Sequence, residues 1–134
     1  MFDKKKVAPQ KRIDSLIGAG TTVEGDVTFA GGLRIDGTVR GCVATAGSEA
    51  ATLVVSEQAK IDGEVRVSHV VINGTVSGPV IANDYLELQA KARVHGDVTY
   101  RSLEMHVGAI VQGKLIHAEQ ESAAVVELKR ATAD

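Results

Sequence analysis

The stretch GLRIDGTVRG, residues 32–41, places apolar side chains at alternate positions and interrupts them with glycine. Its last three residues, 39–41, are the start of a pattern of the form apolar-x-Gly-x-apolar, which recurs along the chain. Six segments share this form: VEGDV (23–27), VRGCV (39–43), IDGEV (61–65), VSGPV (76–80), VHGDV (94–98) and VQGKL (111–115). Their glycines are 16, 22, 15, 18 and 17 residues apart. Such a period indicates a repeat architecture in which similar units stack on one another.

A second apolar pair lies between these segments, and its distance to the next glycine takes two values. In four repeats the last residue of the pair precedes the glycine by eight residues, and in two, at Ile35 and Ile72, by six. Short alternation of apolar and polar residues predicts β-strands. Since so short a unit cannot bury its own inner face, it must stack on copies of itself. The sequence therefore predicts an all-β, single-domain β-helix, a solenoid of about six rungs.

Two columns of apolar residues are expected to face the inside of this coil. The first is Val23, Val39, Ile61, Val76, Val94 and Val111, and the second is Val27, Val43, Val65, Val80, Val98 and Leu115. The repeated glycines between them either point outward or occupy turns that need positive φ, and the sequence does not choose. Asp97 and Lys114, on the outer side of neighbouring rungs, are expected to stack as opposite charges.

The repeat divides the chain into three parts. These are a basic N-terminal tail (residues 1–14), a β-helical domain (15–116) and a polar C-terminal tail (117–134), and we expect both tails to be flexible. The longest glycine spacing spans a small and polar stretch, residues 44–52, which we interpret as a loop. In the C-terminal tail, Val125, Val126 and Leu128 suit either a short helix or a disordered segment.

The composition limits the class of protein. A chain of 134 residues has room for one domain, and with 3% aromatic residues its core must consist of Val, Ile, Leu and Ala. The net charge of -2 argues against generic nucleic-acid binding. Cys42 is the only cysteine, which excludes an intrachain disulfide and a thiolate metal cluster. No stretch has the apolar character of a secretory signal or a membrane span, so we expect a cytoplasmic protein.

The opening MFDKKK, the stretch GLRIDGTVRG and the later GDV and INGTV units together resemble the bactofilins, over roughly residues 13–116. Bactofilins are bacterial cytoskeletal proteins. The resemblance implies a right-handed β-helix, polymerisation into filaments without nucleotide, and attachment at the cytoplasmic face of the inner membrane. It also implies that the filaments localise cell-envelope or cell-shape machinery, with cell-envelope proteins as partners, and it favours contacts between like ends.

The two ends of a β-helix expose unpaired backbone groups over an apolar cross-section, and such an edge recruits another chain unless it is covered. The residues expected at this polymerisation interface are Ile17, Val23 and Val27 in the first rung and Val107, Val111, Leu115 and Ile116 in the last. These segments carry neither a proline nor an aromatic plug. The chain also lacks a GxxxxGK[ST] phosphate loop, so we expect a homopolymer that assembles through both ends without nucleotide.

The N-terminal tail suggests an anionic membrane surface as a second partner. Met1 and Phe2 begin the tail, and the Phe2 ring suits insertion at a lipid interface. Lys4, Lys5 and Lys6 can meet anionic headgroups at about 1 kcal/mol each. Because a filament presents many copies of the tail, weak single contacts add up to firm attachment. The alternative is that the lysines only keep the tail soluble.

An enzyme is the main alternative, because hexapeptide acyltransferases are also β-helices and use a histidine as general base. Rungs of 15 to 22 residues with two-residue alternation do not fit a six-residue repeat. Neither His95 nor His106 has an evident orienting carboxylate next to it, and the scattered histidines and Cys42 fit no metal-ligand spacing. We therefore predict a non-enzymatic, cofactor-free protein without a catalytic or metal site. A β-helical adaptor that does not polymerise is the third class.

Overall fold

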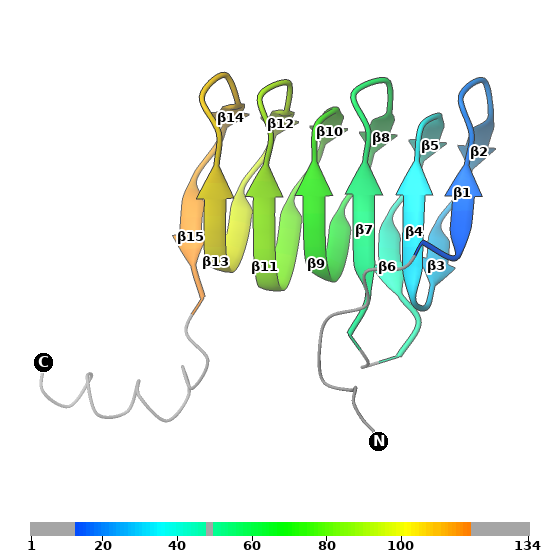
Figure 1. Ribbon diagram of the computed structural model, residues 1–134, viewed down its shortest axis with the longest axis horizontal. Coiled ribbons are helices and arrows are strands. Elements are labelled where there is room, and N and C mark those ends of the chain that lie inside the picture. Colours follow the sequence, from blue (N-terminus) through cyan, green and yellow to red (C-terminus); the bar gives the residue numbers. More distant parts are fainter. Residues whose placement is uncertain (1–12, 48–49, 119–134) are drawn as a thin grey trace, which may run out of the picture.

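Short strands joined by tight corners make up residues 13–47 and 50–118, the parts of the chain that the computed structural model describes. They wind as a coil of six rungs with three strands in each rung (Figure 1). These residues contain no helix, which confirms the predicted all-β solenoid. The strands are β1 (Ser15–Ile17), β2 (Thr22–Glu24), β3 (Val27–Phe29), β4 (Gly32–Ile35), β5 (Thr38–Arg40), β6 (Val43–Thr45), β7 (Thr52–Val55), β8 (Lys60–Asp62), β9 (Val65–Ile72), β10 (Thr75–Ser77), β11 (Val80–Leu88), β12 (Arg93–His95), β13 (Val98–Met105), β14 (Ile110–Gln112) and β15 (Leu115–His117).

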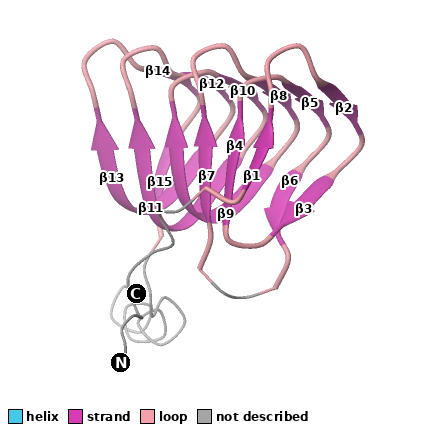
Figure 2. Cartoon of the chain, turned by 45° about the vertical axis from the view of Figure 1, so that its right-hand side comes forward, coloured by secondary structure: helices cyan, strands magenta, loops and turns pink. Residues whose placement is uncertain are grey.

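Each strand pairs in parallel with strands one rung away, so three faces run along the coil (Figures 1 and 2). Face 1 contains β1, β4, β7 and the second halves of β9, β11 and β13. Face 2 contains β2, β5, β8, β10, β12 and β14. Face 3 contains β3, β6, the first halves of β9, β11 and β13, and β15. The three long strands continue from face 3 into face 1 of the next rung.

The strand register aligns the apolar columns that the repeat predicts. The first predicted column, from Val23 to Val111, runs along face 2, and the second, from Val27 to Leu115, runs along face 3. A third column on face 1 joins Ile17, Ile35, Val55, Ile72, Leu88 and Met105. In the four middle rungs the residues of these columns are fully buried, and no polar or charged side chain is buried in the described residues. Full burial of each Val, Ile or Leu side chain contributes roughly 1.5–3 kcal/mol.

The repeated glycines occupy the corner between faces 2 and 3, so the second alternative from the sequence, a turn with positive φ, holds for part of the column, and close stacking explains the rest. Gly63 and Gly78 have φ of 157° and 149°, in the region that favours glycine. Gly41 and Gly113 have no positive φ, yet a Cβ at either position would collide with the carbonyl oxygen of the corresponding glycine one rung before. The column of glycines therefore lets successive backbones stack closely at this corner.

The two spacings in the repeat correspond to two lengths of the corner between faces 1 and 2. Short corners, such as Asp36–Gly37 between β4 and β5, occur in the second and fourth rungs, and the other rungs have longer corners. In Figure 1 the longer corners stand out as the tall loops at the top of the coil. Gly37 stacks so closely on the preceding corner that a Cβ there would meet the carbonyl oxygens of Gly18 and Thr21.

Three details of the structure differ from the predictions made from the sequence. The predicted loop 44–52 is shorter, because Ala44 belongs to β6 and Thr52 begins β7, where both pair with neighbouring rungs. The coil extends past residue 116, because β15 ends at His117. Asp97 receives a hydrogen bond of 3.0 Å from the backbone N–H of Lys114, so this contact links carboxylate and amide rather than two side-chain charges.

Candidate functional site

The first and last rungs each have one side without a neighbouring rung in the described residues. β1, β2 and β3 pair only with the second rung. At the other end, β14, β15 and the second half of β13 pair only with the fifth rung. Both ends therefore present backbone donors and acceptors that can form a further parallel or antiparallel ladder.

Exposed apolar side chains gather at the same two ends. Among the described residues, the large hydrophobic side chains that are exposed are Leu16 in the first rung, Met105, Val107, Ile110, Leu115 and Ile116 in the last, and Ile13, which precedes β1 and lies over face 1 of the middle rungs. The cause is visible within one column: Val98 is 0% exposed and Leu115, one rung later, is 45% exposed, because no further rung covers it. Together with the open backbone edges, these side chains make each end a surface suited to association.

The structure places all seven predicted interface residues in the end rungs, in three different settings. Five continue the inward columns: Ile17, Val23, Val27 and Val111, which are half-buried, and Leu115. Ile116 lies on the outer side of face 3, because it aligns with Thr99 rather than with the buried column. Val107 lies in the corner between β13 and β14 and is 96% exposed.

Sequence reasoning missed four exposed residues. Met105 and Ile110 lie in the last rung and Leu16 in the first, whereas Ile13 precedes β1 and lies over face 1 of the middle rungs. Leu16 aligns with the outward Arg34, so alternation along β1 was a usable signal for its exposure.

Aromatic side chains do occur near the ends, but they do not plug them. Phe29 ends β3 in the first rung and is buried to 8% exposure, and the Tyr100 and His117 rings contact each other at the last rung with centroids 5.7 Å apart. These rings lie on face 3 only. Since Ile17 and Val23 on the other two faces stay half-buried, Phe29 does not close the first rung.

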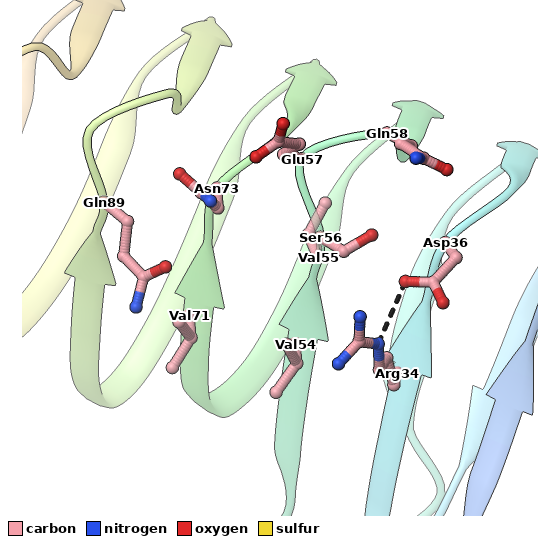
Figure 3. Close-up of a pocket in the computed structure, with 10 residues that line it drawn as sticks. All are labelled: Arg34, Asp36, Val54, Val55, Ser56, Glu57, Gln58, Val71, Asn73 and Gln89. Atoms are coloured by element: carbon pink, nitrogen blue, oxygen red, sulfur yellow. Dashed lines mark hydrogen bonds and ion pairs between the residues drawn. The ribbon is translucent and has the colours of Figure 1, made fainter. Parts of the chain in front are cut away.

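A polar groove of about 450 Å³ runs across face 1 beside its corner with face 2 (Figure 3). Asp36 accepts a hydrogen bond of 2.9 Å from Arg34, and a hydrogen bond from Ser56 is the main cause that lowers the pKa of Asp36, with Arg34 second. Glu57 forms an ion pair of 3.7 Å with Lys91 two rungs later. Because both acids of the groove have cationic partners, the arrangement suits bracing between rungs rather than acid–base chemistry.

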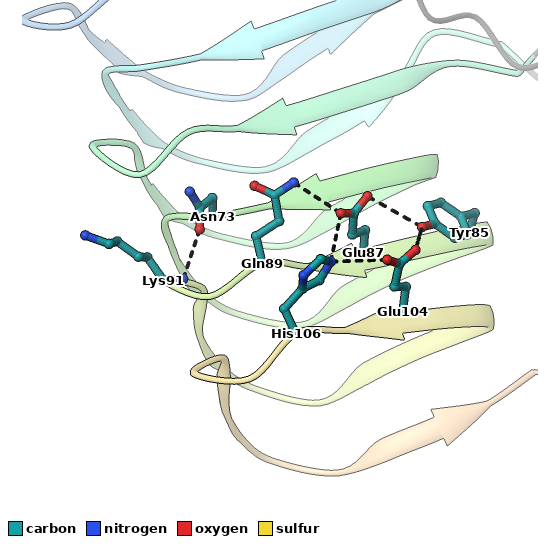
Figure 4. Close-up of polar contacts among 7 residues, drawn as sticks. All are labelled: Asn73, Tyr85, Glu87, Gln89, Lys91, Glu104 and His106. Atoms are coloured by element: carbon teal, nitrogen blue, oxygen red, sulfur yellow. Dashed lines mark hydrogen bonds and ion pairs between the residues drawn. The ribbon is translucent and has the colours of Figure 1, made fainter.

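Two carboxylates and an imidazole converge on face 1 near the C-terminal end (Figure 4). The Nε2 atom of His106 lies 3.1 Å from Glu87 and 3.2 Å from Glu104. The expectation that His106 has no orienting carboxylate is therefore wrong. The Tyr85 hydroxyl donates a hydrogen bond of 2.8 Å to Glu104. Burial, followed by the hydrogen bond to Glu104, raises the pKa of Tyr85 to about 12.

The other candidates for chemistry have simple structural contacts. His95 bonds the Gln112 side chain at 2.6 Å, and His117 bonds the backbone carbonyl of Arg101 at 3.0 Å. Cys42 is exposed, and its backbone N–H donates to Asp26.

The predicted membrane-binding residues, Met1, Phe2 and Lys4 to Lys6, lie outside the described residues, as does the possible helix near Val125. Within the described ranges, no helix has the length and apolar character that crossing a membrane requires.

Comparisons with known proteins identify a family of polymer-forming proteins. The profile of a family described as "Bactofilin: Polymer-forming cytoskeletal" matches residues 15–116. The bactofilin BacO of Myxococcus xanthus (strain DK1622) is 28% identical to this chain over 102 residues, which cover 76% of this chain and 78% of that protein. No solved structure is significantly similar.

Proposed function

This chain belongs to the bactofilin family of polymer-forming cytoskeletal proteins, and from that premise we propose that it assembles end to end, without nucleotide, into filaments at the inner membrane. The filaments act as a scaffold that localises cell-envelope or cell-shape machinery. The role is structural rather than catalytic, and its first partner is a second copy of the chain.

The observation that carries this proposal is the distribution of exposed apolar side chains. The middle rungs bury every residue of the three columns, whereas all the exposed large hydrophobic side chains of the described residues except Ile13, which lies over face 1 of the middle rungs, belong to the first and last rungs. An open strand edge beside apolar surface favours pairing with another chain. Stacking of one end on another would cover Leu115 as the last rung covers Val98.

Electron microscopy of the purified protein, with and without added nucleotide, tests the proposal directly. Filaments should form equally well in both samples. Leu115→Arg should abolish them, because burying an unpaired guanidinium in an end contact costs several kcal/mol. The charge lies in the last rung, so circular dichroism should still show a folded β-rich protein.

A matched charge in the outer surface of a middle rung, Val71→Arg, controls for added charge, since Val71 lies away from both ends. Filaments in the Leu115→Arg protein would contradict a C-terminal end contact. A wild-type protein that stays monomeric would favour the non-polymerising adaptor instead.

The membrane contact is proposed from the sequence of the N-terminal tail. Phe2 supplies one ring for the interface, and three successive lysines, Lys4 to Lys6, supply positive charge for anionic headgroups. One tail binds weakly, and a filament multiplies it by avidity. Attachment should therefore require both the tail and the polymer.

Co-sedimentation with anionic vesicles tests this contact. Deleting residues 1–8 should release the protein from vesicles and leave filaments intact, because the deletion ends before β1. Phe2→Ala and added salt should each weaken binding, the first by removing the ring and the second by screening the lysines. A deleted protein that sediments with vesicles as well as the full chain would assign the lysines to solubility alone.

A further inference from the structure

We infer that Glu87, Glu104 and His106 form a binding site for one divalent transition-metal ion, with Zn²⁺ as the best fit. The three residues each offer one ligand atom, and these atoms lie within 4.8 Å of one another. Glu87 belongs to β11, Glu104 to β13, and His106 follows β13 at the corner. The site joins the fifth and sixth rungs, and it does not depend on polymerisation.

The separations between the ligand atoms match a metal coordination shell. Zn²⁺ bonds to nitrogen and oxygen ligands are about 2.0–2.2 Å long, so two ligands of a tetrahedral ion lie roughly 3.3–3.5 Å apart. The Nε2 atom of His106 lies 3.1 Å from Oε2 of Glu87 and 3.2 Å from Oε2 of Glu104. The ligand oxygens of Glu87 and Glu104 lie within 4.8 Å of each other, so adjustment of the side chains would bring all three atoms around one ion.

Hydrogen bonding alone satisfies this arrangement poorly. One imidazole nitrogen carries at most one hydrogen, yet Nε2 of His106 faces two carboxylate oxygens at once. Glu87 and Glu104 are also direct cross-strand neighbours, a placement that is unfavourable for two like charges. A divalent cation between the three ligand atoms would neutralise both carboxylates and use the imidazole lone pair.

Neighbouring side chains hold the ligands in this orientation (Figure 4). The Tyr85 hydroxyl lies 2.8 Å from Oε1 of Glu104 and 3.5 Å from Oε1 of Glu87, so it restrains the oxygens that face away from His106. Gln89 donates a hydrogen bond of 3.1 Å to Oε2 of Glu87. Outer hydrogen bonds of this kind orient the ligands of protein metal sites.

The ligand set and its exposure select the ion. Ca²⁺ and Mg²⁺ prefer shells made only of oxygen, whereas an imidazole together with carboxylates suits Zn²⁺ and its first-row neighbours. The His106 side chain is 42% exposed and that of Glu104 is 55% exposed, which leaves room for water as the remaining ligand. The site is therefore open, and the ion would tie the last rung to the rung before it.

Competition with a zinc-binding dye, on protein without an affinity tag, tests the site. The wild-type chain should take one Zn²⁺ per chain, and excess Mg²⁺ or Ca²⁺ should not displace it. His106→Ala should weaken zinc binding by more than about 100-fold, since loss of a ligand must exceed the 10–100-fold cost of losing an outer partner. Tyr85→Phe should weaken it within that 10–100-fold range.

His95→Ala is the matched control, because His95 is also exposed and also bonds a side chain of the next rung. It should bind zinc like the wild type. Glu104→Gln offers a second test that keeps the side-chain volume, and circular dichroism confirms the fold of each variant. Absence of zinc binding in the wild type, or equal binding by the wild type, His106→Ala and Glu104→Gln, would overturn the site. Neither result would bear on filament formation.

Discussion

At the scale of single residues, glycine sets how closely successive rungs stack. A side chain at Gly41 would meet the carbonyl oxygen of Gly25 and the backbone nitrogen of Asp26, although Gly41 itself has no positive φ. Gly18 is different, because nothing lies within 4 Å of a Cβ added there and its φ is not positive. Comparing substitutions at the two positions distinguishes steric crowding from the general effect of replacing glycine.

Gly41→Ala should therefore destabilise the fold by about 1–3 kcal/mol or more, as overpacking does in a rigid site. Gly18→Ala should be neutral or stabilise by up to about 1 kcal/mol, because alanine restricts the unfolded chain. Urea unfolding followed by circular dichroism measures both. Both variants belong in a Val23→Arg/Leu115→Arg background, in which both ends are blocked, so that assembly does not add to the apparent stability. Equal free energies of unfolding would show that the corner has room for a methyl group.

At the scale of strands and corners, the sequence predicts what lies inside the coil better than what meets on its surface. Alternation identified the columns that contain Val94 and Val98, because one side of every strand must be apolar. The two spacings likewise corresponded to two corner lengths. The contact between Glu87 and His106 spans 19 residues and depends on the register between β11 and β13. That register cannot be predicted from a local sequence pattern.

Part of that cluster was nevertheless visible in the sequence. Glu104 and His106 are two residues apart, the spacing that places side chains on one side of a strand. The loop predicted at residues 44–52 is too long, because here a local pattern was misleading. Small polar composition suggested a loop, but pairing with neighbouring rungs extends β6 and β7 into that stretch.

Strand stability should vary along the coil, because each rung of a solenoid is stabilised mainly by its neighbours. In a Val23→Arg/Leu115→Arg double variant, in which both ends are blocked, we expect the slowest amide hydrogen exchange in β8 to β11 and the fastest in β1 to β3, β14 and β15. Wild-type filaments should gain protection mainly in the end strands, where contacts form. Mass spectrometry of both samples measures the difference. Uniform protection along the isolated coil, or a gain confined to its middle, would contradict end-to-end assembly.

At the scale of the whole molecule, the two ends differ in apolar surface. The C-terminal end exposes Met105 and Leu115 of the inward columns and Val107 in a corner, whereas the inward residues of the first rung stay half-buried: Ile17, Val23 and Val27. A large apolar surface is covered best by an equally large one, which favours contacts between like ends. Such contacts are two-fold, so the filament would have no polarity, whereas contacts between unlike ends give a polar filament.

Two end variants distinguish these arrangements. Val23→Arg blocks the N-terminal end and Leu115→Arg blocks the C-terminal end. With contacts between like ends, each variant alone should form a homodimer through its intact end. The Val23→Arg dimer should be the tighter one, because it uses the larger apolar surface. With contacts between unlike ends, each variant alone should be monomeric, because every contact would need one blocked end.

Mixing the two variants completes the test. If like ends meet, the mixture contains only the two homodimers, since no intact end of one variant matches an intact end of the other. If unlike ends meet, the intact C-terminal end of Val23→Arg accepts the intact N-terminal end of Leu115→Arg, and a heterodimer appears only on mixing. Analytical ultracentrifugation of each protein and of the equimolar mixture measures these species. We expect homodimers before mixing and no new species after it, and a heterodimer that forms only in the mixture would establish a polar filament instead.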